Sequence, residues 1–199
     1  MRSPILSTKE FYHVYNRGVN KRNIFQNVKD YKRFLTALSL LNTNSHSIHA
    51  LNGSKSHQQN EDDKLVNILA FCLMPNHFHL FLEQRVHDGI SKFMHKICMS
   101  HAKYFNYYYK RSGALFEPKF KSKHIDNQAY YSQISKYIHR NPLDLFRGDD
   151  EKAKRDFLLS YQWSSLGEYI KPRRDNFIDR RVMDDFGNAE EYVTFLFSE

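Results

Sequence analysis

The chain has 199 residues, of which 41% are hydrophobic, including 16 phenylalanines and 13 tyrosines. This composition suffices for the core of one good-sized domain and excludes a wholly disordered chain. A net charge of +8 and a pI near 9.4 predict attraction to polyanions, nucleic acid first and anionic membrane second. A basic surface that is only solvated is the alternative interpretation.

The cysteines and the N-terminus indicate where the protein works. Cys72 lies in an apolar segment and Cys98 in a predicted helix, so we expect both as small buried side chains in a reducing cytoplasm. The first residues contain no apolar stretch of the signal-peptide type. The longest apolar run, residues 65–74, is interrupted by Asn67 and is too short to cross a bilayer. We therefore expect a cytoplasmic, nucleoid-associated protein without a membrane partner.

Hydrophobic periodicity predicts the elements. Strands are expected at residues 11–16, 65–74, 77–84 and 115–125, the last of these as a strand or an extended arm. Helices are expected at residues 30–41, 89–109, 126–140, 152–161 and 189–197. The second and third strands form a hairpin in the middle of the sheet, and the polar segment 42–64 forms a long mobile loop. The order predicts an α+β fold with an antiparallel sheet and helices packed on one face.

Two histidines in the third predicted strand, His77 and His79, indicate a metal site. Residues two apart on a strand point to the same face, while Phe78 points to the other. Two imidazoles held side by side on a rigid strand supply half of a metal site. The other half must come from elsewhere in the chain.

Tyr137 and Asn141 share one face of the 126–140 helix. One interpretation is that Tyr137 packs against the sheet. The other is that it attacks a phosphodiester to form a phosphotyrosine, assisted by a divalent cation on His77, His79 and the Asn141 oxygen. This mixed nitrogen and oxygen donor set suits Mg²⁺ or Mn²⁺. The sequence alone leaves both interpretations open.

Basic residues interleaved with aromatic ones predict a surface for single-stranded nucleic acid, through charge neutralisation and base stacking. Tyr107 and Tyr109 fall outside the apolar stripe of their helix and are expected to be exposed. A solvated strand face is the alternative for the lysines of the fourth strand. The candidate DNA-binding residues are Arg17, Lys21, Arg22, Lys110, Arg111, Lys119, Lys121, Lys123 and Arg140.

Four ordered segments resemble a known family. They are FYHVYNRG from Phe11, LMPNHFHLFLEQ from Leu73, RSGALFEPKFKSK from Arg111 and YIHRNP from Tyr137. Together they resemble the single-tyrosine HUH transposases (named for His, a hydrophobic residue and His), and most closely the REP-associated tyrosine transposase branch. The later YQWSSLGEYI, from Tyr161, is similar to that branch as well, so the resemblance covers roughly residues 9–170.

The resemblance implies a ferredoxin-like or RRM-like palm that cleaves and rejoins single-stranded DNA beside REP-like or element-end hairpins. It implies Tyr137 as the nucleophile that takes the 5′ phosphate, with His77, His79 and Asn141 as ligands of Mg²⁺ or Mn²⁺. It further implies a catalytic domain over residues 9–148, containing the loop 42–64, and a C-terminal helical extension over 149–199. The protein would act as a monomer or a homodimer.

The chain departs from the family pattern in its long 42–64 loop, in Glu117-Pro118 where a Gln-Gly-like pair is usual, and in residues 143–146. None of these departures removes a catalytic group.

Two rival interpretations exist. A cupin-like metalloenzyme would use Glu83 with the histidine pair, but the chain has only 7 glycines for the turns of such a barrel. A domesticated, non-catalytic single-stranded nucleic-acid-binding module on the same palm would share the charge and the aromatic residues, but it has no use for the His77, His79 and Tyr137 set. A further hypothesis is that the acidic C-terminal residues cover the basic surface as an autoinhibitory flap.

Overall fold

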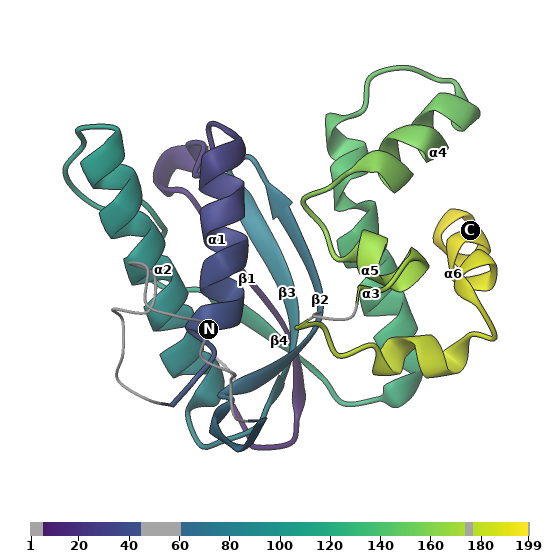
Figure 1. The fold of residues 1–199 in the computed structure, drawn as a ribbon, viewed down its shortest axis with the longest axis horizontal. Coiled ribbons are helices and arrows are strands. Elements are labelled where there is room, and N and C mark those ends of the chain that lie inside the picture. The colour runs from purple at the N-terminus through teal and green to yellow at the C-terminus, as the bar shows by residue number, and fades with distance from the viewer. Residues whose placement is uncertain (1–5, 45–60, 174–176, 199) are drawn as a thin grey trace.

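The computed structural model describes residues 6–44, 61–173 and 177–198 (Figure 1). Most of the predicted 42–64 loop lies outside the described residues. The strands are β1 (Phe11–Arg17), β2 (Val66–Met74), β3 (His77–Gln84) and β4 (Lys121–Ile125). The described helices are α1 (Val28–Leu40), α2 (Gly89–Tyr108), α3 (Tyr131–Arg140), α4 (Glu151–Ser160), α5 (Leu166–Ile170) and α6 (Ala189–Phe197).

The four strands form one antiparallel sheet in the order β2-β3-β1-β4. Each of α1 and α2 joins two strands that have a third strand between them, which is the ferredoxin-like arrangement. The predicted α+β fold with an antiparallel sheet and a helical face is confirmed. The β2-β3 hairpin is not central, however, because β2 lies at one end of the sheet.

One face of the sheet is apolar and is covered by α1 and α2 (Figure 1). Phe78 of β3 is fully buried there, and its ring lies 5.0 Å from that of Phe34 on α1. Helix α1 begins in a capping box, in which Asn27 accepts from the backbone of Asp30 and Asp30 accepts from that of Asn27. The helix-spaced apolar residues of α1 are thus fixed in register over the sheet.

Helix α3 and the C-terminal helices lie on the other side of the sheet (Figure 1). Two tyrosines of this part bond to the backbone of β2: Tyr161 donates to the Leu73 carbonyl at 2.7 Å, and Tyr169 to that of Leu69 at 2.8 Å. Two isolated bridges, Cys72 with Ser164 and Ile68 with Ile178, continue the pairing along the outer edge of β2. Residues 161–169 and Ile178 of the predicted C-terminal extension thus contact the sheet of the predicted catalytic domain.

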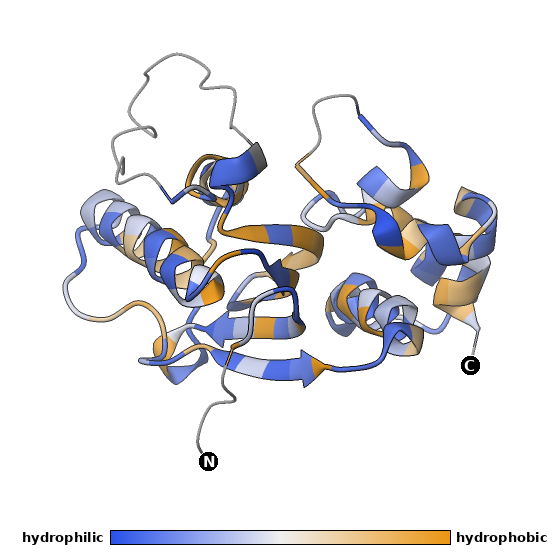
Figure 2. Ribbon diagram, turned by 90° about the horizontal axis from the view of Figure 1, so that it is seen from below, coloured by the Kyte–Doolittle hydropathy of each residue, from blue (hydrophilic) through white to orange (hydrophobic). Residues whose placement is uncertain are grey.

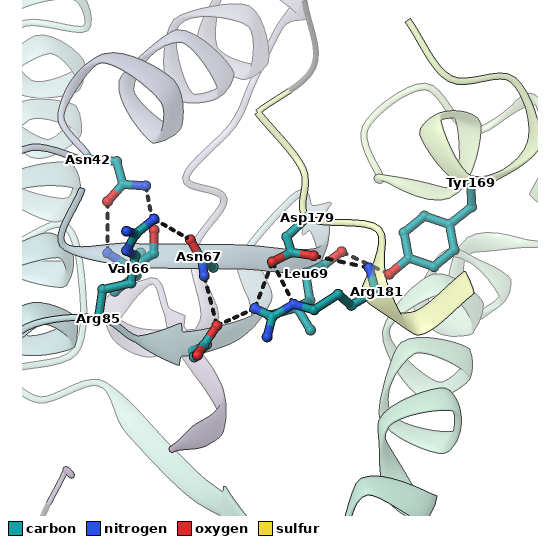
Figure 3. Close-up of polar contacts among 9 residues, drawn as sticks. Asn42, Val66, Asn67, Leu69, Arg85, Tyr169, Asp179 and Arg181 are labelled. Atoms are coloured by element: carbon teal, nitrogen blue, oxygen red, sulfur yellow. Dashed lines mark hydrogen bonds and ion pairs between the residues drawn. The ribbon is translucent and has the colours of Figure 1, made fainter. Parts of the chain in front are cut away.

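A polar network fixes the last part of this contact (Figure 3). Arg181 forms ion pairs with Asp179, at 2.7 Å, and with Glu83 at the end of β3. Glu83 also accepts from Asn67 of β2 at 2.7 Å. Arg181 additionally lies over the Phe11 ring, 5.5 Å from its centroid. One guanidinium thus connects the C-terminal segment directly to β1 and β3, and through Glu83 to β2.

The structure divides the 115–125 segment, which was predicted as a strand or an extended arm, and it corrects the start of the predicted 126–140 helix, because α3 begins at Tyr131. Residues 115–120 are not a strand: only Phe116 forms a bridge there, to Gly18, and β4 begins at Lys121. The short helix α5 was not predicted. Hydropathy falls across the sheet, with β2 almost wholly apolar and β4 hydrophilic up to Ile125 (Figure 2). No described helix combines the length and the apolarity needed to cross a membrane.

Candidate active site

The face of the sheet away from α1 and α2 carries the polar side chains. Strand pairing places Tyr15 opposite His79 and Arg17 opposite His77, and directly paired residues of antiparallel strands share a face. His13 lies two residues before Tyr15 and shares that face as well. The alternation of two neighbouring strands therefore gathers three histidines, one tyrosine and one arginine on a single surface.

The histidine rings are held by specific partners. The rings of His77 and His79 lie 5.0 Å apart and nearly perpendicular, at 86°. His77 bonds through Nδ1 to the Asn76 side-chain oxygen at 2.6 Å, and Nδ1 of His79 lies 2.8 Å from Nε2 of His13. In each ring of the pair this leaves Nε2 for another partner, which is the arrangement seen in metal-binding histidines.

Burial keeps these imidazoles neutral. It lowers the pKa of His79 to about 3, with smaller contributions from His13 and His77, and that of His13 to about 4, with a smaller contribution from Lys123. The pKa of His77 is lowered too, mainly by burial. A neutral imidazole carries the free lone pair that a metal ion requires, so the pair is ready to coordinate at neutral pH.

Helix α3 brings Tyr137 over this surface. The helix is anchored at its start by Tyr131, whose ring lies 4.4 Å from that of Phe11 and 5.5 Å from that of Phe81. Two turns later the Tyr137 ring meets His79 edge-on, with centroids 5.6 Å apart. Tyr137 keeps 53% of its surface exposed. It is therefore not a core tyrosine, and a substrate can reach it.

Asn141 follows α3 and reaches the same place. It is buried, its amide nitrogen donates to the Tyr137 carbonyl at 2.8 Å, and it lies close enough to His77 to offset part of the lowering of that imidazole's pKa by burial. Within the described residues, no group of three His, Cys, Asp or Glu side chains could hold a metal ion. A cation on the histidine pair therefore needs a ligand of another type, and the Asn141 amide oxygen is placed to be one.

Two hollows flank the histidines and Tyr137. One, of about 380 Å³, is lined by Tyr15, Asn16, Arg17, Asn76, His77, His79, Glu117 and Lys121. The other, of about 420 Å³, is lined by Gln133, Lys136, Tyr137, Arg140, Asn141, Leu143 and Asp144. Both hollows carry basic side chains, Arg17 and Lys121 in the first and Arg140 in the second, together with one carboxylate each.

The structure separates the candidate DNA-binding residues into two groups. Lys121 and Lys123 of β4 pair with Tyr15 and His13 and so share the histidine face. Arg17 and Arg140 line the two hollows. The loop with Lys21 and Arg22 is tied to the His77 end of β3, because Asn76 donates to the Lys21 carbonyl. Lys119 precedes β4, so the alternation of side chains along that strand does not assign it to either face.

Lys110 and Arg111 belong to the second group, at the C-terminal end of α2. Lys110 lies over the ring of Tyr107, and Arg111 donates to the side chain of Asn106 at 2.6 Å. Tyr107 is exposed, as expected, but Tyr109 is partly buried and donates to Asp30 at 2.8 Å. The prediction of an exposed Tyr109 was therefore wrong, because its hydroxyl completes the cap of α1.

Glu83 is not part of the candidate site. Its carboxylate is engaged by Asn67 and Arg181 at the far end of β3. This removes the third ligand that a cupin-like site would need.

Comparison with known proteins decides the family. The model of the IS200-like transposases matches residues 7–141, which is more than half of the chain. The chain belongs to the IS200-like transposase family. A solved structure of a REP-associated tyrosine transposase, bound to a REP hairpin, has the same fold with a TM-score of 0.60. The alignment covers 90% of this chain and 93% of that one at 14% identity. No curated protein matches the chain.

The structure of this IS200-like transposase adds His13, which sequence analysis missed. Its signal was present, because His13, Tyr15 and Arg17 alternate along β1 just as His77 and His79 do along β3. The sequence did not show that β1 pairs with β3, and this pairing is what places His13 beside His79.

Proposed function

We propose that this IS200-like transposase cleaves and rejoins single-stranded DNA beside a hairpin through a covalent 5′-phosphotyrosine on Tyr137. The observation that carries the proposal is the position of Tyr137. Its ring lies edge-on to both His79 and His13, at 5.6 and 5.5 Å, and yet remains half exposed. A solvent-accessible nucleophile beside two neutral imidazoles is the arrangement that attack on a phosphodiester requires.

In the proposed step, the Tyr137 oxygen attacks the phosphorus and loses its proton. The bond from phosphorus to the 3′ oxygen breaks, and that oxygen takes up a proton to become a free 3′ hydroxyl. Rejoining is the reverse reaction, in which a 3′ hydroxyl attacks the phosphotyrosine and releases Tyr137. The energy of the phosphodiester is kept in the covalent intermediate, so no external energy source is needed.

The residues suited to hold a divalent cation are His77, His79 and Asn141, and we propose Mg²⁺ or Mn²⁺ as that cation. Such an ion would neutralise the charge that develops on the attacked phosphate. The donor set fits it: the two rings have Nδ1 engaged elsewhere, and the Asn141 nitrogen already donates to a carbonyl, which leaves the amide oxygen. Asn76 and His13 fix the orientation of the two rings.

Positive charge around this centre would hold the strand. Arg17 and Lys121 line the hollow beside His77 and His79, and Arg140 lines the hollow beside Tyr137. Lys21, Arg22, Lys119 and Lys123 extend this positive charge along the same face in our proposal, whereas Lys110 and Arg111 would meet a more distant part of the DNA. Because Tyr137 lies over the histidines of its own chain, one copy carries the complete site, and we favour a monomer over a homodimer as the acting form.

A denaturing-gel adduct assay tests the proposal. Single-stranded hairpin oligonucleotides from the flanks of the source gene are incubated with protein and Mn²⁺ or Mg²⁺. We expect a protein–DNA adduct that disappears in Tyr137→Phe and with EDTA. Tyr15→Phe is the matched control, because the Tyr15 ring also lies 5.5 Å from that of His79. An adduct that survives Tyr137→Phe and disappears in Tyr15→Phe would assign the nucleophile to β1 instead.

Tight hairpin binding without an adduct from any flanking sequence would instead favour the non-catalytic binding module on the same fold.

A further inference from the structure

An ion pair closes one side of the hollow beside His77. Both Nε and Nη2 of Arg17 lie 3.2 Å from the same oxygen, Oε1, of Glu117. The two side chains are 39% and 30% exposed, so solvent reaches the pair and it is not part of the core. A carboxylate is thus the present partner of an arginine on the face where we propose that DNA binds.

The backbone holds Glu117 at this position. Its N–H donates to the Arg17 carbonyl at 2.8 Å, and the neighbouring residues Gly18 and Phe116 form a bridge. The Asn16 amide donates to the Glu117 carbonyl at 3.5 Å, and the Arg17 N–H donates to the side-chain oxygen of Asn16. The segment before β4 therefore cannot withdraw the carboxylate without breaking its pairing with β1.

The same hollow has the features of a phosphate site. Arg17 pairs in register with His77, so its guanidinium belongs to the histidine face and lines the same hollow as that imidazole. On the other side Lys121 lies over the ring of Tyr15. A guanidinium binds carboxylates and phosphates through the same pair of N–H donors, so the two anions compete for it.

We propose that this hollow binds the phosphodiester next to the scissile one, with Arg17 and Lys121 as its ligands and Glu117 as the resident anion that DNA displaces. The inference rests on the proposed function, since it needs a strand crossing the histidine face. Displacing the carboxylate costs binding free energy, so Glu117 reduces the affinity that a strand gains by placing a phosphate in this hollow. Glu117 is thus a specificity-determining residue, because it sets how much binding depends on correct placement of the backbone.

Salt-dependent binding tests the inference without cleavage. Fluorescence anisotropy with a labelled single-stranded hairpin oligonucleotide is measured in EDTA across a series of KCl concentrations. We expect Glu117→Gln to bind about 3- to 10-fold more tightly than wild type, with a salt slope steeper by about 0.7, the value for one phosphate neutralised on a single strand, because no carboxylate then offsets the Arg17 charge. Arg17→Gln should lose a similar slope, and Glu117→Gln should then add nothing in the Arg17→Gln background.

Glu151→Gln is the control for net charge. Glu151 is an ion-paired carboxylate on α4, bonded to Lys154, and its removal changes the total charge by the same amount. Equal gains in Glu117→Gln and Glu151→Gln, or an unchanged affinity and slope in Glu117→Gln, would overturn the inference. Thermal melting checks the fold of each variant, and Glu117→Ser serves as a second variant with the same expected sign.

The two proposals fail separately. A Tyr137-dependent adduct with no effect of Glu117 on binding would overturn this inference and leave the catalytic proposal standing. Glu117-dependent binding with no adduct from any substrate would overturn the catalytic proposal and support the phosphate site.

Discussion

The two faces of the sheet are built from alternate residues of the same strands, yet they have opposite properties. On β3, Phe78 is fully buried against Phe34 of α1, while His77 and His79 on either side of it belong to the face under α3 and line the first hollow. On β1, Val14 is buried between His13 and Tyr15 in the same way. A one-residue step thus separates the side chains that hold the fold together from those proposed to act on DNA.

The largest expected effect on stability comes from a substitution on the apolar face. Phe78→Ala removes a ring packed against Phe34 and Phe116, and should lower the free energy of unfolding by about 3–5 kcal/mol. Tyr137→Phe, on the other face, should change it by less than about 0.5 kcal/mol, since it removes one half-exposed hydroxyl. Urea unfolding of both variants measures the difference. Similar losses in the free energy of unfolding of the two variants would show that the polar face contributes to folding stability as much as the apolar face does.

A smaller effect tests whether His13 orients its neighbour. His13→Ala leaves Nδ1 of His79 without its ring partner, so we expect Mn²⁺ affinity to fall about 10- to 100-fold, as for other residues that orient metal ligands. Calorimetric titration of Mn²⁺ is the measurement, and it does not depend on cleavage. Tyr15→Phe, which keeps the ring contact with His79, should bind the metal as wild type does. Unchanged affinity in His13→Ala would make His13 only a packing residue.

A third prediction concerns what holds α3 over the open face. His139 of α3 is fully buried and bonds to the Tyr192 hydroxyl and the Ser165 hydroxyl, each at 2.7 Å. Burial lowers its pKa to about 3, whereas in the unfolded chain it is near 6.5. The unfolded state therefore binds more protons below pH 6.5. The contribution of His139 to the free energy of unfolding is complete above pH 6.5 and falls by about 1.4 kcal/mol per pH unit toward pH 3.

Unfolding measured at pH 7 and pH 5 checks this prediction. His139→Gln should be less stable at pH 7 but lose less stability on acidification than wild type. His87→Gln, at an exposed position, is the matched control and should follow wild type. Parallel pH profiles of His139→Gln and wild type would exclude His139 as a source of the acid sensitivity.

Sequence patterns predicted what depends on local periodicity. The alternation in 77–84 placed the histidines correctly, and the spacing of Tyr137 and Asn141 placed both at the same end of α3. The interaction of His13 with His79 joins residues 66 positions apart, and only strand pairing creates it. The Arg17–Glu117 pair likewise depends on a loop that runs beside β1 without being a strand. Helix α5, at five residues, is too short for its periodicity to be recognised.

The edges of the sheet bear on how the protein behaves when it is concentrated. Segments from the C-terminal part occupy the outer side of β2 through the bridges at Cys72 and Ile68, so the apolar edge strand offers no free ladder there. The opposite edge is β4, where exposed Lys121 and Lys123 stand at alternate positions. A second copy pairing along β4 would bring rows of lysines together. The charge that we propose attracts a DNA strand therefore also discourages edge-to-edge polymerisation of the protein.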